Sequence, residues 1–132
     1  MFPSLFVLLY VAHLLADYPL QTDHQASHKA NRGAAGWRAN LTHATTHVIA
    51  CLLVLVAAAV VLDESVGVLP GAAAVALIGA THAWIDRRWP VAAWMRIARQ
   101  QKWAAAGGAA HVDQAAHVLV LAAAALTLTA LS

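Results

Sequence analysis

The sequence has few charged residues, one cysteine and a single glutamate. Only 11% of its 132 residues are charged, whereas 61% are hydrophobic, and this balance is too apolar for a soluble domain of that length. The lone Cys51 cannot form an intrachain disulfide, so cysteine usage does not indicate a redox compartment. The net charge of +2 gives no reason to expect a nucleic-acid partner. We therefore expect a membrane protein.

The hydrophobic residues are grouped in four segments that predict membrane helices. Three segments approach or exceed the roughly 20 residues needed to cross a bilayer core. The first segment is shorter, and we expect it to be retained, because no Lys or Arg precedes it as in a signal peptide. The predicted spans are residues 2–17, 41–62, 66–86 and 109–131, with an amphipathic interfacial helix at residues 90–103. The predicted fold is a single all-α domain, residues 1–132, built as an integral membrane four-helix bundle with this additional interfacial helix.

The basic residues predict the orientation of these helices. All eight lie in the loop between the first and second spans or in the loop between the third and fourth, whereas the remaining connection carries Asp63 and Glu64. With four spans the two basic loops face the same side, which the positive-inside rule makes cytoplasmic. We expect a multi-pass protein of the bacterial inner membrane, surrounded by lipid, with both termini outside.

Histidines and aspartates recur in pairs four residues apart, one pair on each predicted span. Residues at this spacing lie one turn apart on the same helix face. Two spans run inward and end with their pairs, and two run outward and begin with theirs, so all four pairs converge at the cytoplasmic end. At a rise of about 1.5 Å per residue, one histidine of each pair lies deep and its partner lies nearer the cytoplasm. The deep residues are His13, His47, His82 and His117, and the shallow ones are Asp17, His43, Asp86 and Asp113.

These eight residues are the predicted metal ligands. Imidazole and carboxylate together suit zinc, manganese or iron, whereas soft copper and iron–sulfur sites require thiolates. Eight donors exceed the four of a closed zinc site, so we expect one or two divalent ions, zinc first, with manganese or iron as alternatives. The competing interpretation is a set of hydrogen bonds that hold the helices together. An aspartate near the bilayer centre costs about 2.5–3.5 kcal/mol on insertion scales, which favours a function over packing alone.

Other polar residues supply candidates for catalysis and substrate binding. The only glutamate, Glu64, is predicted to lie on the far side of the membrane, so Asp113 or Asp23 is the expected catalytic base. Four further residues are expected to contact a substrate or to support the ligands, namely Gln21, Lys29, Arg87 and Gln114.

The first of these motifs carries a family resemblance. The stretch HLLADYPLQTDHQASHK, residues 13–29, resembles the HxxxDFxLQTxxxAxxK signature of small bacterial and phage membrane proteins classed as a domain of unknown function, with Tyr18 in place of the usual phenylalanine. The pair His43 and His47, the HxxID-type block at residues 82–86 and the DQxxH-type block at residues 113–117 resemble later parts of the same family. The His/Asp blocks are also similar to those of membrane-bound metal-dependent hydrolases, a likeness of pattern only.

Three functions are compatible with these residues. The first is a metal-dependent hydrolase acting on an anionic lipid or small amphiphile at the cytoplasmic interface, with nearby bases holding the anionic group. The second is a di-iron oxidase or hydroxylase, because paired histidines on membrane helices are similar to those of membrane desaturases, although the aspartates depart from that pattern. The third is a non-enzymatic metal transporter or sensor, for which the outer halves of the spans offer few polar groups. The sequence leaves a homodimer open, and also a structural helper without chemistry.

Overall fold

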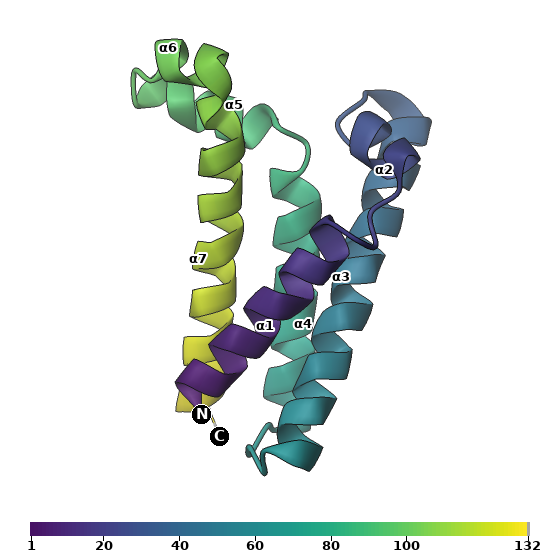
Figure 1. The fold of residues 1–132 in the computed structure, drawn as a ribbon, viewed down its shortest axis with the longest axis vertical. Coiled ribbons are helices and arrows are strands. Elements are labelled where there is room, and N and C mark those ends of the chain that lie inside the picture. Colours follow the sequence, from purple (N-terminus) through teal and green to yellow (C-terminus); the bar gives the residue numbers. More distant parts are fainter. Residues whose placement is uncertain (132) are drawn as a thin grey trace.

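The computed structural model describes residues 1–131, and this part of the chain contains helices and no strand (Figure 1). The prediction of an all-α fold is therefore confirmed. The four long helices are α1 (Phe2–Asp17), α3 (Gly33–Val61), α4 (Val68–Ile85) and α7 (Ala109–Ala130). The connections contain the shorter elements α2 (Asp23–His28), α5 (Trp89–Ile97), α6 (Gln101–Trp103) and η1 (Ala104–Gly108).

Three helical segments are long and apolar enough to cross a membrane. They are α3, α4 and the continuous segment Gln101–Ala130, which contains α7. Helix α1 is apolar but has only 16 residues, which corresponds to about 24 Å of helix, less than the roughly 30 Å hydrocarbon core. It also runs obliquely across the other long helices (Figure 1). By length, therefore, the structure has three spanning helices, and the fourth predicted span falls short.

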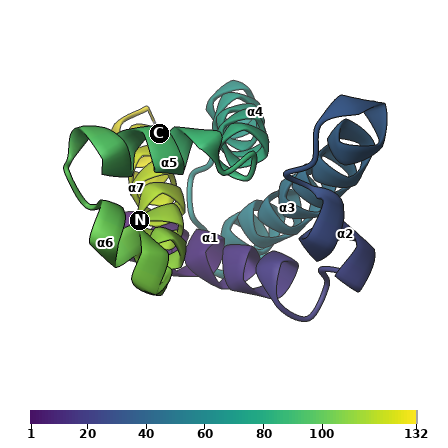
Figure 2. The same cartoon turned by 90° about the horizontal axis from the view of Figure 1, so that it is seen from above.

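The four long helices pack around a shared apolar interior. Helix α1 contacts α3 and α7, and α4 contacts the same two helices; seen from above, α1 lies along one side of the others (Figure 2). Small residues permit close approach, as at Gly79 of α4, where an added Cβ would lie 2.6 Å from Val48 Cγ2 of α3. The largest core side chains below the predicted site are Leu5, Leu9, Leu55, Ile78, Leu121 and Leu128.

The outward faces of the long helices are apolar as well. Val60 and Leu53 of α3 and Leu119 of α7 are exposed, and an apolar surface of this extent suits contact with lipid. The connections at the two ends differ in charge. Helices α2, α5 and α6 lie at one end, and the N-terminus, the C-terminal end of α7 and the α3–α4 turn lie at the other (Figure 1). The two basic loops are therefore at the same end of the molecule, as predicted.

Helix α3 is longer than the predicted span 41–62, because its first turns extend back through two glycines. It begins at Gly33 rather than at residue 41. Gly33 has a φ of +82°, which glycine adopts without steric cost. Gly36 lies against the Asn31 carbonyl, where a side chain would not fit. The other long helices keep their predicted bounds to within two residues, α4 beginning at Val68 rather than at residue 66.

The interfacial helix predicted at residues 90–103 is two short helices. Helix α5 ends at Ile97 and α6 begins at Gln101, because Arg99 between them has a φ of +57°, outside the helical region. Val91 and Met95 of α5 are buried, whereas Trp94 and Arg96 are exposed, so the predicted amphipathic character is present. Gly107, with a φ of +93°, then turns the chain into α7.

Candidate metal centre

The eight predicted ligands form one cluster, called the His/Asp cluster below, at the end of the molecule where the basic loops lie. Each of the four long helices contributes its pair, although Asp86 follows the last residue of α4. The donor atoms form three groups, and within each group all donor atoms lie within 4.8 Å of one another. The inner group is His13, Asp17, His47 and His82, the outer group is Asp86, Asp113 and His117, and the middle group is His43, His82 and Asp86.

Asp17 is at the centre of the inner half of the cluster. Its Oδ1 lies 3.2 Å from His43 Nε2, 3.1 Å from His47 Nε2 and 3.9 Å from His82 Nε2. Its Oδ2 lies 3.1 Å from His13 Nε2. Donor atoms bound to tetrahedral zinc at 2.0–2.1 Å are about 3.3–3.4 Å apart. The spacing of these nitrogen and oxygen atoms therefore fits the ligand shell of such an ion.

Gln114 links two of these ligands across helices. Its Nε2 donates to Asp17 Oδ2 at 3.1 Å, and its Oε1 lies 3.2 Å from His13 Nε2. The amide therefore orients a carboxylate and an imidazole of α1 from its position on α7. Outer partners of this kind fix the rings and carboxylates of metal sites.

The outer half of the cluster contains two carboxylates. Asp86 Oδ2 lies 3.1 Å from His82 Nε2, 3.5 Å from His43 Nε2 and 2.9 Å from the Lys29 ammonium. Burial on its own would raise the pKa of Asp86, but the adjacent His82 imidazole and the Lys29 charge hold it well below its usual value. The lowered pKa of Asp86, which follows the span, favours the ionised carboxylate, and this is the form that binds metal ions.

His117 is held by its own helix. Its Nδ1 lies 2.9 Å from the backbone oxygen of Asp113 and 3.5 Å from Asp113 Oδ2. Because a carbonyl oxygen can only accept, Nδ1 carries a proton in this arrangement, and in the neutral imidazole Nε2 then holds the lone pair. Such a backbone contact through one nitrogen is the usual arrangement of a histidine that binds metal through the other.

The four deep histidines are in mutual contact. The ring centroids of His47 and His82 are 3.5 Å apart, and those of His82 and His117 are 4.4 Å apart. His13 lies 5.2 Å from His47 and 5.1 Å from His117. The ring centroid of His43, a shallow residue, lies 4.8 Å from that of His47 and 5.1 Å from that of His82. The shallow and deep predicted ligands are therefore in contact.

Several buried ring nitrogens in the cluster have no hydrogen-bond partner among the described residues. They are Nδ1 of His43 and His47 and Nε2 of His82 and His117. His82 Nε2 approaches Asp86, but without the geometry of a hydrogen bond. A buried polar atom left unpaired costs about 1–3 kcal/mol. Hydrogen bonds through Asp17 and Gln114 join the helices but leave these four nitrogens unpaired, and a set of imidazoles and carboxylates is one that a divalent metal accepts.

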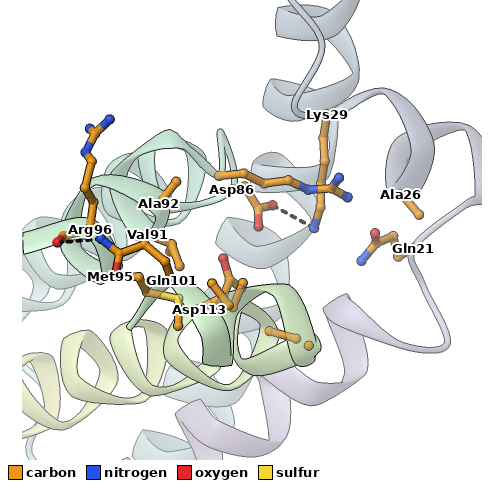
Figure 3. Close-up of a pocket in the computed structure, with 15 residues that line it drawn as sticks. Gln21, Ala26, Lys29, Asp86, Val91, Ala92, Met95, Arg96, Gln101 and Asp113 are labelled. Atoms are coloured by element: carbon orange, nitrogen blue, oxygen red, sulfur yellow. Dashed lines mark hydrogen bonds and ion pairs between the residues drawn. The ribbon is translucent and has the colours of Figure 1, made fainter. Parts of the chain in front are cut away.

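A cavity of about 860 Å³ adjoins the outer group. Asp86 and Asp113 lie on its inner wall together with Lys29, whose ion pair with Asp86 is drawn in Figure 3. Its apolar wall consists of Val91, Ala92, Met95, Ala104, Ala109 and Ala110. Its remaining polar side chains are Gln21, Arg88, Arg96 and Gln101. The cavity therefore has a charged end at the cluster and an apolar side along α5, η1 and the start of α7.

The supporting residues predicted from the sequence have different positions. Gln21 donates to the Asp17 backbone oxygen at 2.8 Å and lies 3.5 Å from His43 Nε2, at the cavity. Asp23, a predicted base, is exposed and belongs to none of the three ligand groups. The reason is the capping box of α2: Thr22 and Gln25 bond to each other's backbone amides and leave Asp23 on the exposed first turn.

Arg87 holds a loop in place and is not directed at the cavity. Its guanidinium donates to the backbone oxygens of Lys29 and Asn31, both at 2.7 Å, and lies 4.5 Å from the centre of the Trp37 ring. These contacts fix the segment that carries Lys29 beside Asp86. The sequence predicted a substrate contact for Arg87; in the structure two of its N–H groups bond to the chain itself, and Arg87 is not among the residues that line the cavity.

Asn40 is a residue that the sequence interpretation missed. It is fully buried on α3, and neither its amide nitrogen nor its amide oxygen has a hydrogen-bond partner among the described residues. The spacing of Asn40, His43 and His47 at i, i+3 and i+7 places them on one helix face. That spacing was the available signal in the sequence.

Comparison with known proteins identifies the family of the chain. No curated protein and no solved structure matches it. One family model, described as "Protein of unknown function (DUF3307)", matches residues 5–132. This range contains every residue of the His/Asp cluster and nearly the whole chain. The chain therefore belongs to this uncharacterised domain family.

Proposed function

We propose that the protein is a membrane-embedded metal-dependent hydrolase that acts on an anionic lipid or small amphiphile. The observation that carries the proposal is the position of the cavity: two of the eight clustered donors, Asp86 and Asp113, form the wall where its charged and apolar parts meet. A hydrolytic site needs a metal, a base and a substrate pocket next to each other. This end of the molecule offers candidates for all three.

The residues of the cluster would hold one or two divalent ions, with zinc preferred and manganese or iron as alternatives. When bound, such an ion polarises an ester or phosphoryl oxygen and lowers the pKa of water. Asp113 is the candidate base as well as a candidate ligand, with one carboxylate oxygen for the ion and the other for the proton, because its side chain is partly exposed and lines the cavity. A carboxylate there can take a proton from an attacking water. Lys29, Arg88 and Arg96 supply positive charge for an anionic head group.

The proposal includes the membrane arrangement. We propose a bundle of four helices in a bacterial inner membrane, with α1 completing the bundle through its contacts with α3 and α7. The basic loops would then face the cytoplasm and the termini the outside. Substrate would reach the cavity from the cytoplasmic leaflet, where α5 presents exposed Trp94 and Arg96. Aromatic and basic residues are typical of that depth.

The interior beneath the cluster favours chemistry over transport. A transported ion needs polar groups along its path. Below the cluster the packed core contains Leu5, Leu9 and Leu55, and its other buried members are also apolar or small. The site is therefore closed on that side, which suits an enzyme or a sensor.

A hydrolysis assay tests the proposal. Purified protein loaded with Zn²⁺ or Mn²⁺ is incubated with phospholipids, isoprenoid phosphates and carboxylic esters, and the released product is measured. We expect product from the wild type and from Asp63→Asn, a matched change in the turn at the opposite end. Asp113→Asn should be slower by about 10²-fold or more. Failure of metal-loaded wild type to release any product would contradict the proposal. Purified protein that contains iron and changes its absorption spectrum with oxygen would instead favour the di-iron oxidase or hydroxylase.

A further inference from the structure

We propose that the His/Asp cluster contains two metal positions of unequal character that share no ligand. The inner position is formed by His13, Asp17, His47 and His82, and the outer position by Asp86, Asp113 and His117. This inference rests on the proposed metal-binding function and adds the number of ions and a division of roles between them.

The inner position has a complete and closed ligand set. Three imidazoles and one carboxylate supply four donors, all from residues that are buried or nearly so. None of the four lines the cavity. Four protein donors with no access for solvent or substrate are the pattern of a structural zinc site. An ion there would tie α1, α3 and α4 together.

The outer position is incomplete and open. It has three protein donors, and two of them, Asp86 and Asp113, line the cavity. Three protein ligands with a further position left for water or substrate are the pattern of a catalytic metal site. Two carboxylates and one imidazole also suit a harder ion such as Mn²⁺ better than the histidine-rich inner set does.

His117 supplies an independent observation for the outer position. It is 4% exposed, and its Nε2 has no hydrogen-bond partner among the described residues. Its Nδ1 is engaged by the Asp113 backbone oxygen at 2.9 Å, so Nε2 is the nitrogen through which the neutral imidazole would bind a metal. A buried, oriented imidazole with an unpartnered Nε2 beside two carboxylates is the arrangement of a metal ligand.

The Lys29 ammonium would compete with a metal ion for Asp86 in the outer position. Its ammonium lies 2.9 Å from Asp86 Oδ2, and Arg87 fixes its backbone through the Lys29 and Asn31 oxygens. A metal that binds Asp86 must therefore displace this ammonium or tolerate a like charge beside it. Removing the Lys29 charge should strengthen binding at the outer position and leave the inner one unchanged.

The middle group, which takes His82 from the inner position and Asp86 from the outer one, defines the rival arrangement. A single ion bound by His43, His82 and Asp86 would draw on both halves of the cluster. The two arrangements predict different metal counts. With two independent positions, substitution of a ligand in one position leaves one ion bound per chain. With a single shared centre, substitution of an inner ligand and substitution of an outer ligand both weaken the binding of the same ion.

The test is to titrate detergent-purified protein with Zn²⁺ and then Mn²⁺ and to count bound ions per chain by elemental analysis. We expect two ions in wild type, one in Asp113→Asn, one in His47→Gln, and an outer affinity raised by about tenfold in Lys29→Met. His111→Ala, which changes an exposed histidine on α7, is the control and should keep two. If His47→Gln does not fold, Asp113→Asn decides the question on its own.

The outcomes separate this inference from the function on which it rests. One ion in wild type, lost or weakened in Asp113→Asn, would overturn the two-position arrangement and leave a single-metal hydrolase standing. No ion in wild type would overturn both. Two ions in wild type and in His111→Ala, with one retained in folded Asp113→Asn and in folded His47→Gln, would support the arrangement as stated.

Discussion

At the scale of single residues, the cluster depends on side chains that orient the ligands as well as on the ligands themselves. Gln114 is the clearest case, because one amide contacts both Asp17 and His13. We predict that Gln114→Leu keeps the number of bound ions but weakens their affinity by about 10–100-fold, as loss of an outer partner does in other metal sites.

The measurement is a competition titration of each variant against a chelator of known affinity. Gln101→Leu is the matched control, since Gln101 is exposed and bonds to the Arg96 backbone oxygen away from the cluster. Equal metal affinity in Gln114→Leu and Gln101→Leu would show that the Gln114 bridge has no part in holding the ligands.

Residue spacing explains why the cluster was predictable and why its surroundings were not. Pairs at i and i+4 share a helix face whatever surrounds them, so the pairing of His13 with Asp17 could be read from sequence. Arg87 and Lys29 lie in different loops, and only the folded chain brings the Arg87 guanidinium to the Lys29 backbone oxygen. No periodicity encodes a contact between two loops.

At the scale of elements, the link between α2 and α3 is held by Arg87. Its two bonds to the oxygens of Lys29 and Asn31 are charge-assisted, and each such bond contributes about 1.5–3 kcal/mol. We predict that Arg87→Gln raises amide hydrogen exchange across this link. The measurement is hydrogen exchange by mass spectrometry in detergent micelles.

Arg88→Gln is the control for that experiment, because Arg88 is the exposed neighbour in the same loop. It should leave exchange across the link unchanged. Unaltered exchange in Arg87→Gln would mean that the link is held by other contacts, and the position assigned to Lys29 would lose its support.

Helices α3 and α4 approach closely at Gly79. An added Cβ would lie 2.6 Å from Val48 Cγ2, and overpacking of this kind costs about 1–3 kcal/mol. We predict that Gly79→Ala lowers the thermal unfolding midpoint in detergent and that Val48→Ala in the same chain restores part of the loss. Gly71→Ala, in the first turn of α4 where the nearest atom is 3.3 Å away, should have a smaller effect.

If Gly79→Ala unfolds at the wild-type temperature, the contact between α3 and α4 is looser than the structure has it.

The residues at which helices begin and end could be predicted only in part from the sequence. A glycine such as Gly33 breaks a helix in one context and begins one in another, and only the position of the Asn31 carbonyl against Gly36 distinguishes the two. Likewise, nothing in the amphipathic pattern at residues 90–103 marks Arg99 as the break.

At the scale of the whole molecule, the arrangement of the ends gives a testable topology. The basic loops lie at one end, and the N-terminus and the C-terminal end of α7 lie at the other with the acidic α3–α4 turn (Figure 1). We predict that a cysteine at Ser65, in that turn, reacts with a membrane-impermeant maleimide in intact cells, whereas one at Ser27 of α2 reacts only after lysis. Both serines are exposed, and a Cys51→Ala background removes the native thiol.

The reverse labelling pattern would place the site outside and overturn the cytoplasmic orientation. Labelling of both positions in intact cells would contradict a spanning arrangement altogether. This labelling does not depend on whether α1 spans, because Ser27 and Ser65 both follow α1 and are separated by α3; three spanning helices without α1 would change only the side on which Met1 lies. The length of α1 could be read from the sequence, but its oblique path across α3 and α7 could not.

The most direct test of the central claim is the metal content of the purified protein, wild type against His82→Ala. His82 belongs to two of the three ligand groups and lies within 3.9 Å of two carboxylates, so its loss removes a donor from the middle of the cluster. The prediction is at least one tightly bound divalent ion per wild-type chain and a clear loss in folded His82→Ala. Wild-type protein without stoichiometric metal would contradict the account.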